Sequence, residues 1–162
     1  MFRAQNKIRS EWSPSFAYGI GLLASDGCLS KDRRHIIFSS KEDEMIVNFK
    51  VSLGLKNKTT RHARGGEKNK KYLMVTFGDI NFYKFLNNIG LHSAKSRTIK
   101  SVFVPDKYFA DFLRGLFDGD GSFYTYWDKR WPNSFGYKLS FASASQNFIN
   151  WLKERLANLY GV

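Results

Sequence analysis

Apolar residues recur at helical spacing in three stretches of the chain. The first lies between Ser40 and Gly54, the second runs from Asp79 to Gly90, and the third lies between Ser145 and Gly161. Ser40 is expected to cap the first helix, and Gly54 is expected to end it. The apolar positions of the three stretches are Met45, Ile46, Phe49 and Leu53, then Phe82, Phe85, Leu86 and Ile89, then Phe148, Ile149, Leu152, Leu156 and Leu159. The spacing predicts three amphipathic helices.

Shorter stretches with strand-like patterning lie between and before these helices. They cover residues 28–31, 36–39, 58–63, 72–77, 122–127 and 136–142, and polar turns at 31–34 and 128–134 join two of the pairs into hairpins. Alternation along a strand assigns side chains to opposite faces. The positions expected to face the helices are Leu73, Val75, Phe77, Tyr137, Leu139 and Phe141, whereas Tyr72, Met74, Thr76, Lys138 and Ser140 are expected to point outward.

One internal repeat organises these elements. Residues 19–27 (GIGLLASDG) align with residues 113–121 (LRGLFDGDG) at a spacing of 94 residues, and each copy leads into a hairpin and then a helix. The pattern predicts an α+β protein built from αββαββα units, with a first unit at 1–92, a linker at 93–105 and a second unit at 106–162. The second unit lacks the last hairpin and helix of the first. We therefore expect residues 1–162 to be less stable, and to bind DNA more weakly, than a version extended by about 35 to 40 residues.

Composition narrows the class of partner. Lys and Arg outnumber Asp and Glu by 26 to 14, which gives a net charge of +12, and 43% of the residues are hydrophobic. A folded chain with this charge is typical of a nucleic-acid-binding protein. An apolar run long enough to cross a membrane is lacking, as is a secretion signal, so we expect an intracellular protein of the cytoplasm, nucleoid or an organelle. Cys28 is the only cysteine, which excludes an intrachain disulfide and a cysteine-based zinc cluster.

The repeated segment places small residues and acids at matching positions. Gly21 and Ser25, like Gly115 and Gly119, are four residues apart and share one helix face, so the two helices are expected to pack closely. Asp26 and Asp120 then lie in the last turns, where the helix dipole disfavours a negative charge. Gly27 and Gly121 follow as expected left-handed caps. Two such carboxylates side by side would be stabilised by a divalent cation, which indicates a Mg²⁺ site suited to phosphodiester hydrolysis.

With Val104-Pro-Asp-Lys-Tyr-Phe-Ala-Asp-Phe112 leading into the second copy, the paired segments resemble the motifs of LAGLIDADG homing endonucleases. The resemblance covers nearly the whole chain, and the second motif is the more specific. It implies a pseudo-twofold pair of units whose antiparallel sheets form a saddle over DNA. It also implies that Asp26 and Asp120, with Gly27 and Gly121 beside them, form the site for Mg²⁺ or Mn²⁺. Lys41 matches a basic residue that the family places near the scissile phosphates.

The second half departs from this pattern and leaves several functions open. Residues 143–146 (SASQ) offer no cation where Lys41 stands in the first half, so Lys138 or Lys129 would have to substitute. The predicted function is site-specific cleavage of double-stranded DNA by a protein that is monomeric when full length, intron-encoded or free-standing. The alternatives are a non-cleaving binder, such as an intron maturase or a regulator on the same fold, and an inactive fragment.

Cations and aromatic residues on the turns and outer strand faces are expected to contact DNA, mostly at phosphates, because a two-stranded ribbon fits the major groove. His35 belongs to one such turn, whereas His62 and His92 show no metal-binding spacing. The expected DNA-binding residues are Lys31, Arg33, Arg34, His35, Lys58, Arg61, Arg64, Lys68, Lys70, Lys71, Tyr72, Tyr124, Tyr126, Lys129, Arg130, Lys138 and Ser140.

Overall fold

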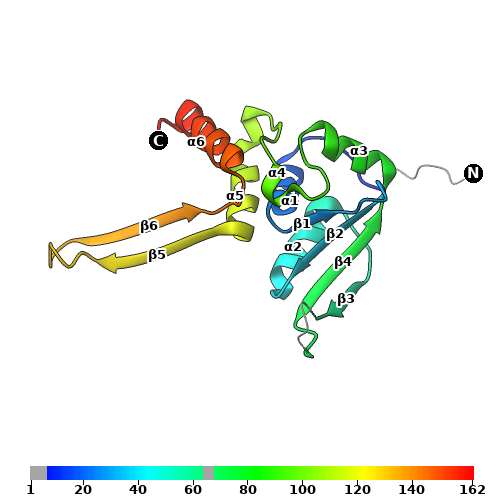
Figure 1. The fold of residues 1–162 in the computed structure, drawn as a ribbon, viewed down its shortest axis with the longest axis horizontal. Helices are drawn as coiled ribbons and strands as arrows, with labels where there is room; N and C mark the ends of the chain where they lie inside the picture. The colour runs from blue at the N-terminus through cyan, green and yellow to red at the C-terminus, as the bar shows by residue number, and fades with distance from the viewer. Residues whose placement is uncertain (1–6, 64–67) are drawn as a thin grey trace, which may run out of the picture.

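The fold consists of two units joined through a central pair of helices (Figure 1). The computed structural model describes residues 7–63 and 68–162. Its helices are α1 (Pro14–Ser25), α2 (Asp43–Leu53), α3 (Ile80–Asn88), α4 (Lys95–Thr98), α5 (Phe109–Asp120) and α6 (Gln146–Tyr160), with a 3-10 turn at Asp106–Tyr108. Its strands are β1 (Gly27–Leu29), β2 (His35–Ser40), β3 (Thr59–His62), β4 (Tyr72–Gly78), β5 (Gly121–Trp127) and β6 (Phe135–Phe141). The predicted α+β class and the order of the elements are confirmed.

The first unit is a four-stranded antiparallel sheet covered on one face by helices. The strand order is β1-β2-β4-β3. The side chains of Ile36, Phe38 and Val75 are buried on the covered face, where Phe38 stacks on Phe49 of α2 with ring centroids 4.2 Å apart. Leu73 and Phe77 are buried as the alternation predicts, because one face of the sheet packs against α2 and α3 and the other remains open.

Several helix ends follow the local sequence, whereas the start of α2 does not. The side chain of Asp79 caps α3 by accepting from the backbone N–H of Phe82, and Ser145 caps α6 in the same way from Phe148. Gly54 adopts the left-handed conformation with φ 65° and ends α2. Ser40 does not cap α2, because β2 continues through Ser40 and the helix begins only at Asp43.

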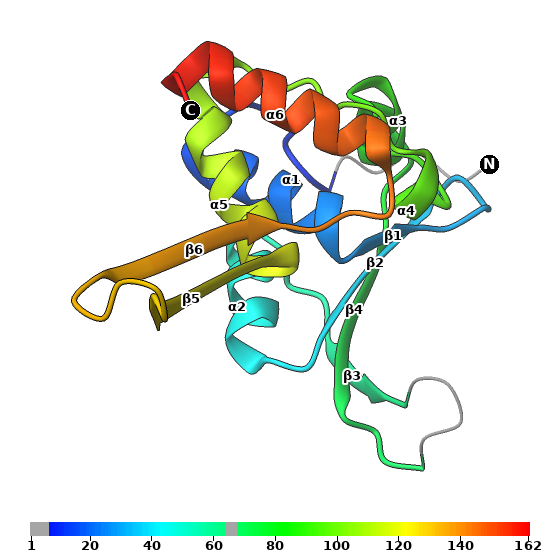
Figure 2. The ribbon, with the colours of Figure 1, turned by 60° about the vertical axis from the view of Figure 1, so that its left-hand side comes forward.

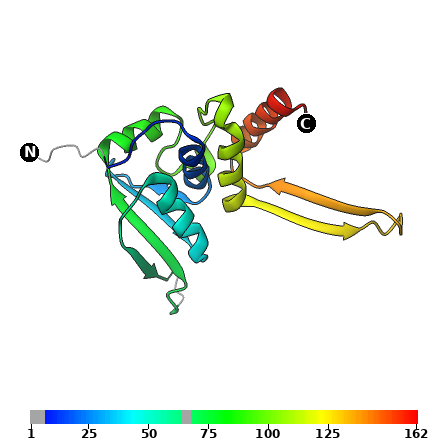
Figure 3. The same ribbon diagram turned by 180° about the vertical axis from the view of Figure 1, so that it is seen from behind.

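The second unit contains α5, a two-stranded antiparallel ribbon of β5 and β6, and α6. Seen from two further directions, the ribbon projects away from the rest of the molecule (Figures 2 and 3). Helix α6 packs on α5, with Trp151 of α6 against the rings of Phe109 and Phe112. The expectation that Tyr137 and Leu139 face covering helices is wrong, because α6 lies on α5 and both side chains are exposed.

The segment between the units is part of the core. The polar linker expected at residues 93–105 instead contains α4 and buries Ile99, Val102 and Val104. In the part of the chain that the structure describes, no helix is both long enough and apolar enough to cross a membrane.

Candidate functional site

The two units meet where α1 and α5 cross at backbone distance. A Cβ atom added at Gly21 would lie 2.2 Å from the carbonyl oxygen of Phe112, and one added at Gly115 would lie 2.1 Å from that of Tyr18. Neither position can therefore hold a side chain unless the helices separate. The small residues in the two motifs bring the ends of α1 and α5 together.

A hydrogen bond joins helices α1 and α5 on the side that faces α2. The Tyr18 hydroxyl donates to the Asp118 carboxylate at 2.7 Å, and the Arg114 guanidinium lies 4.6 Å from the centre of the Tyr18 ring. The pKa of Tyr18 is raised to about 12, mainly by burial and secondly by the hydrogen bond to the negatively charged Asp118. The neutral phenol is thus the form held between the helices.

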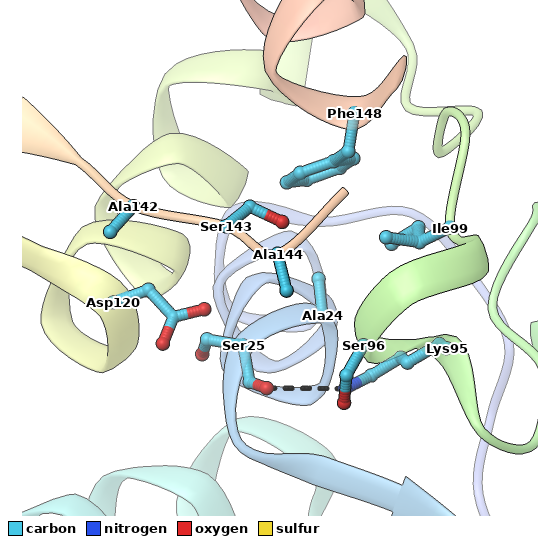
Figure 4. A pocket seen from close by; sticks show the side chains of 10 residues that line it. All are labelled: Ala24, Ser25, Lys95, Ser96, Ile99, Asp120, Ala142, Ser143, Ala144 and Phe148. Carbon is cyan, nitrogen blue, oxygen red and sulfur yellow. Dashed lines mark hydrogen bonds between the residues drawn. The ribbon is translucent and has the colours of Figure 1, made fainter. Parts of the chain in front are cut away.

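The carboxylates of Asp26 and Asp120 lie at the same end of this helix pair. A Cβ at Gly119 would lie 3.3 Å from Oδ2 of Asp26, so the Asp26 carboxylate lies against the last turn of α5. Partial burial raises the pKa of Asp120, and the positive charge of Lys95 opposes that rise. Figure 4 shows the Asp120 carboxylate at the edge of a pocket that it shares with Ser25 and Lys95.

Lys95 is the residue that the sequence reasoning missed. Its side chain is only 5% exposed, and its ammonium donates to the carbonyl oxygen of Ser25 at 3.1 Å (Figure 4). Burial lowers the pKa of Lys95, whereas the nearby charges of Asp120 and Asp26 raise it. The segment between the units therefore places a cation within electrostatic range of both carboxylates.

Local backbone geometry turns Lys95 inward. Ala94, which precedes α4, has a positive φ of 57°, a conformation that costs a residue with a Cβ on the order of 1 kcal/mol. The apolar side chains of Leu91 and Ile99 are buried on either side and fix the segment. In the sequence, the only signal was a lysine within a short apolar-flanked stretch, and the repeat gave it no counterpart.

The pocket around these groups has a volume of about 340 Å³. Its wall combines α1, α4 and α5 with the segment that joins β6 to α6, so both units contribute (Figure 4). The lining residues are Ala24, Ser25, Lys95, Ser96, Ile99, Asp120, Ala142, Ser143, Ala144 and Phe148. Hydroxyls, one carboxylate and one ammonium thus meet in a single recess.

Gly27 and Gly121 have a different role from the one expected. Neither adopts a left-handed conformation: Gly121 is extended with φ −84° and ψ 160°, and Gly27 already belongs to β1. A Cβ at Gly27 would lie 2.6 Å from the carbonyl oxygen of Leu23, and one at Gly121 would lie 2.1 Å from the ring of Phe117. Glycine is needed because the chain turns straight from helix to strand against the preceding helical turn.

The two units differ at the position where a basic residue was expected. Lys41 lies 5.0 Å from the centre of the Tyr72 ring, outside the residues that line the pocket. Gly27 pairs with Phe38 in the first unit and Gly121 with Phe141 in the second, so the position matching Lys41 is Ala144. Lys95 lines the same wall as Ala144, whereas Lys138 lies farther along the ribbon over Tyr124.

Cations surround the open face of the first sheet. The turn before β2 is fixed by the Asp32 carboxylate, which accepts hydrogen bonds from the backbone N–H groups of Arg34 and His35. The hydrogen bonds from His35 are the largest cause of the lowered pKa of Asp32, and the one from Arg34 adds to it. Arg61 pairs with Leu73 and therefore shares the side of the sheet on which Leu73 lies, where the side chain of Arg61 is exposed, while Thr60 and His62 share the open face. Arg64 lies outside the described residues. The side chains of Lys31, Arg33, Arg34, Lys58, Lys68, Lys70 and Lys71 are exposed, as expected of phosphate contacts.

The ribbon of the second unit has a polar face with its own register. Ser122 and Ser140 are paired and share a hydrogen bond of 2.8 Å between their hydroxyls. On the same face lie Tyr124 and Tyr126, and Lys138 lies 5.9 Å from the centre of the Tyr124 ring. At the tip, Lys129 and Arg130 are exposed, and Arg130 also pairs with Asp128 at 3.4 Å.

Within the described ranges, no cluster of three or more His, Cys, Asp or Glu side chains is arranged for a metal ion. The oxygen donors at hand are the carboxylates of Asp26 and Asp120 and the neighbouring backbone carbonyls. Mg²⁺ prefers oxygen ligands, often uses only one or two carboxylates, and retains several waters. The donor set therefore fits such an ion, with substrate and water completing its shell.

Comparison with solved structures gives distant fold relatives, whereas no curated protein sequence matches. The structure of full-length DUF199/WhiA from Thermatoga maritima has 14% identity and a TM-score of 0.51, with coverage of 95% of this chain and 47% of that one. The chain thus spans about half the length of that relative. The structure of I-DmoI in complex with DNA and Mn has 14% identity and a TM-score of 0.47, with coverage of 91% and 78%.

The sequence profile of the LAGLIDADG-like domain matches residues 13–90 and 108–161, which together are most of the chain. The two matched segments contain α1 and α5 with the hairpins that follow them. The repeat, the helix crossing and this match agree, and the chain belongs to the LAGLIDADG-like domain family.

Proposed function

We propose that the protein is a site-specific, metal-dependent endonuclease of the homing type that acts on double-stranded DNA. One observation carries the proposal: the carboxylates of Asp26 and Asp120, from the matching ends of two helices, both interact electrostatically with the buried ammonium of Lys95, which lines an open pocket together with Asp120. Acids at helix C-termini are unfavourable for stability, because the helix dipole repels them. A site that requires them explains why both are present.

Asp26 and Asp120 would hold the divalent cation, which when bound would supply charge neutralisation at the scissile phosphate and lower the pKa of an attacking water. The chain's own residues position the reaction. The Lys95 ammonium, which donates to the Ser25 carbonyl, would supply positive charge to a phosphodiester that gains negative charge during the reaction. Because Lys95 is buried, little rearrangement is needed to hold that charge in place.

The DNA would lie across the open face of the first sheet and the polar face of the ribbon. A net charge of +12 favours a polyanion, and the exposed lysines and arginines lie on turns that flank these faces. Tyr124, Lys138 and Ser140 would read base edges from the ribbon, and Met74, Thr76 and His62 from the first sheet. Lys41, over the Tyr72 ring, would contribute a phosphate contact at the start of α2.

A second candidate is a DNA binder that does not cut. Lys95 already provides an ammonium near both acids, and Ala144 stands where the first unit has Lys41. The ammonium would let the carboxylates persist in a structural ion pair without metal. The alanine would leave the second unit without the basic residue that the first unit has in Lys41. The two functions differ in the fate of bound DNA and not in its binding.

The experiment is selection of bound duplexes from a randomised DNA library, followed by incubation of these duplexes with the protein in Mg²⁺. Cleavage that Asp26→Asn and Asp120→Asn each abolish, with binding in Ca²⁺ kept within a few-fold, supports the nuclease. Asp111→Asn, near the start of α5 and away from the pocket, is the matched control and should cut normally. Tight binding without cleavage by the wild type would establish the non-cleaving binder instead.

A further inference from the structure

The open face of the first sheet has a centre without charge. Paired residues of neighbouring strands share a face, so the register places them in rows across the sheet. We define the uncharged centre by the members of two adjacent rows: Cys28, Ile37 and Thr76 in one, and Ser39, Met74 and Thr60 in the other. Each of these side chains is at least partly exposed. The centre therefore presents methyl, methylene, thiol, thioether and hydroxyl groups to its surroundings.

The cations of this unit lie at the two ends of the sheet. At one end, the turn before β2 exposes Arg33 and Arg34. At the other end, Lys41 follows β2 and Lys71 precedes β4, and both are exposed. Phosphates are the groups that such cations contact in DNA. A duplex held at both ends of the sheet would turn the base edges between its phosphates toward the uncharged centre, so charge complementarity favours DNA as the occupant of this face.

The uncharged centre offers few hydrogen-bonding groups to a base. Ile37 has none, and the Met74 thioether is only a weak acceptor. The Thr60 hydroxyl donates to the Met74 carbonyl at 3.4 Å, so its proton is already used. Guanine and adenine are read by bidentate contacts from guanidinium, ammonium or amide groups, which these six side chains lack. Apolar contact is the readout that remains, and in the major groove the C5-methyl of thymine is the group that accepts it.

We propose that the uncharged centre recognises its part of the DNA through thymine methyl groups in the major groove. The inference rests on the proposed function, because it requires DNA across the open face. The two rows are about 7 Å apart along the strands, and each spans three strands over about 10 Å. At about 3.4 Å per base pair, this area covers roughly two to three pairs. We therefore expect a short cluster of A·T pairs in the part of the target that lies under the first unit.

The polar face of the ribbon differs from this centre. Ser122 and Ser140 carry hydroxyls that bond to each other at 2.8 Å, and Tyr124 and Lys138 add a phenol and an ammonium on the same face. These groups form hydrogen bonds with base edges and gain little from a methyl. Dependence on thymine methyls should therefore be confined to one side of the target. Burial of one methyl corresponds to roughly a fourfold change in dissociation constant.

Binding of residues 1–162 to a duplex selected from a randomised library, measured in Ca²⁺ by fluorescence anisotropy, tests the inference. Deoxyuridine, which pairs like thymidine but lacks the methyl, replaces each thymidine in turn. We expect a roughly fourfold loss of affinity at two or three neighbouring positions on one side and no loss elsewhere. At those positions, a 5-methylcytosine pair should bind about fourfold better than a cytosine pair, because it restores the methyl on a different hydrogen-bonding edge.

A double-mutant cycle assigns the methyl contact to the sheet. Ile37→Ala and Met74→Ala each remove apolar surface from the uncharged centre, so each should abolish the uracil penalty at one of the sensitive positions. Ser140→Ala, at a half-buried position on the ribbon, is the matched control. Whatever its effect on affinity, it should leave every uracil penalty unchanged.

The outcomes separate this inference from the proposed function. Equal binding of all uracil-substituted duplexes overturns the inference, whereas cleavage of the same duplex in Mg²⁺ would leave the nuclease standing. Uracil penalties that neither Ile37→Ala nor Met74→Ala changes also overturn it, since the methyls would then act through the shape of the DNA. Binding without cleavage removes only the nuclease, because the readout in Ca²⁺ does not depend on cutting. A chain that selects no duplex overturns both.

Discussion

Replacement of Gly115 by alanine tests whether the helix crossing sets both stability and the site. The added Cβ would lie 2.1 Å from the Tyr18 carbonyl oxygen, 3.0 Å from its carbon and 3.1 Å from the Leu22 nitrogen. All three are backbone atoms, so rotation of a side chain cannot relieve the contact. The shortest distance is about 0.9 Å below the 3.0 Å that real Cβ atoms respect, and α1 and α5 must separate by roughly that amount.

The magnitude follows from two opposing effects. Overpacking costs about 1–3 kcal/mol, here at the upper end because the contacts are with backbone atoms, and alanine recovers about 1 kcal/mol of helix propensity relative to glycine. We expect a net loss of about 2 kcal/mol in the free energy of unfolding, which for a chain of this size lowers Tm by roughly 4–8 °C. Asp26 and Asp120 lie at the ends of these two helices, so separation of the helices also moves the carboxylates. We therefore expect the cleavage rate to fall by more than the loss of folded protein explains.

Urea unfolding followed by tryptophan fluorescence measures the loss, and cleavage of the selected DNA well below the new Tm measures the second effect. Gly119→Ala serves as a comparison, since its new Cβ would meet the Ser25 side chain, 1.9 Å from Oγ and 2.5 Å from Cβ. The double variant Gly119→Ala/Ser25→Gly removes those atoms and should recover most of the stability. If Gly115→Ala unfolds at or above the wild-type urea concentration and cuts normally, the close crossing is not what positions the acids.

Four further predictions concern charge. Lys95→Met, similar in length, should reduce cleavage at least tenfold with DNA binding kept within a few-fold, measured on the selected duplex; unchanged cleavage would remove Lys95 from the site. Folding raises the pKa of Tyr18 from 10.0 to about 12, so its contribution to the free energy of unfolding is full below pH 10 and is lost as pH rises toward 12. Between pH 10 and pH 12 the urea midpoint of Tyr18→Phe should therefore change less with pH than that of the wild type. DNA affinity should fall with salt with a log–log slope of about −0.9 per neutralised phosphate, and joint replacement of Lys68, Lys70 and Lys71 by glutamine should flatten that slope without moving the cleavage position. EDTA should abolish cleavage, Mg²⁺ or Mn²⁺ should restore it, and activity in EDTA would exclude a metal-dependent reaction.

Local patterns in the sequence determined most of the elements. Period-two alternation over residues 72–77 and helical spacing after Asp79 and Ser145 reflect which side of an element is apolar, and that property belongs to neighbouring residues. The repeat then related two distant segments, which indicated that α1 and α5 pack and that Asp26 and Asp120 lie at matching ends. Gly21 and Gly115 could be identified for the same reason, because close helix packing requires small residues at fixed spacing.

Only the tertiary structure decided what covers each apolar face and which side chains converge. Alternation assigned Tyr137 and Leu139 to an apolar side, but whether a helix lies over that side depends on how α6 packs, and α6 lies on α5. The face occupied by Arg61 depends on its register with Leu73 across a hairpin, which the sequence of one strand does not encode. Lys95 joins the acids through a left-handed turn at Ala94 and the burial of its flanking segment. These outcomes depend on contacts between residues far apart in the chain, and such contacts leave no periodic pattern in the sequence around them.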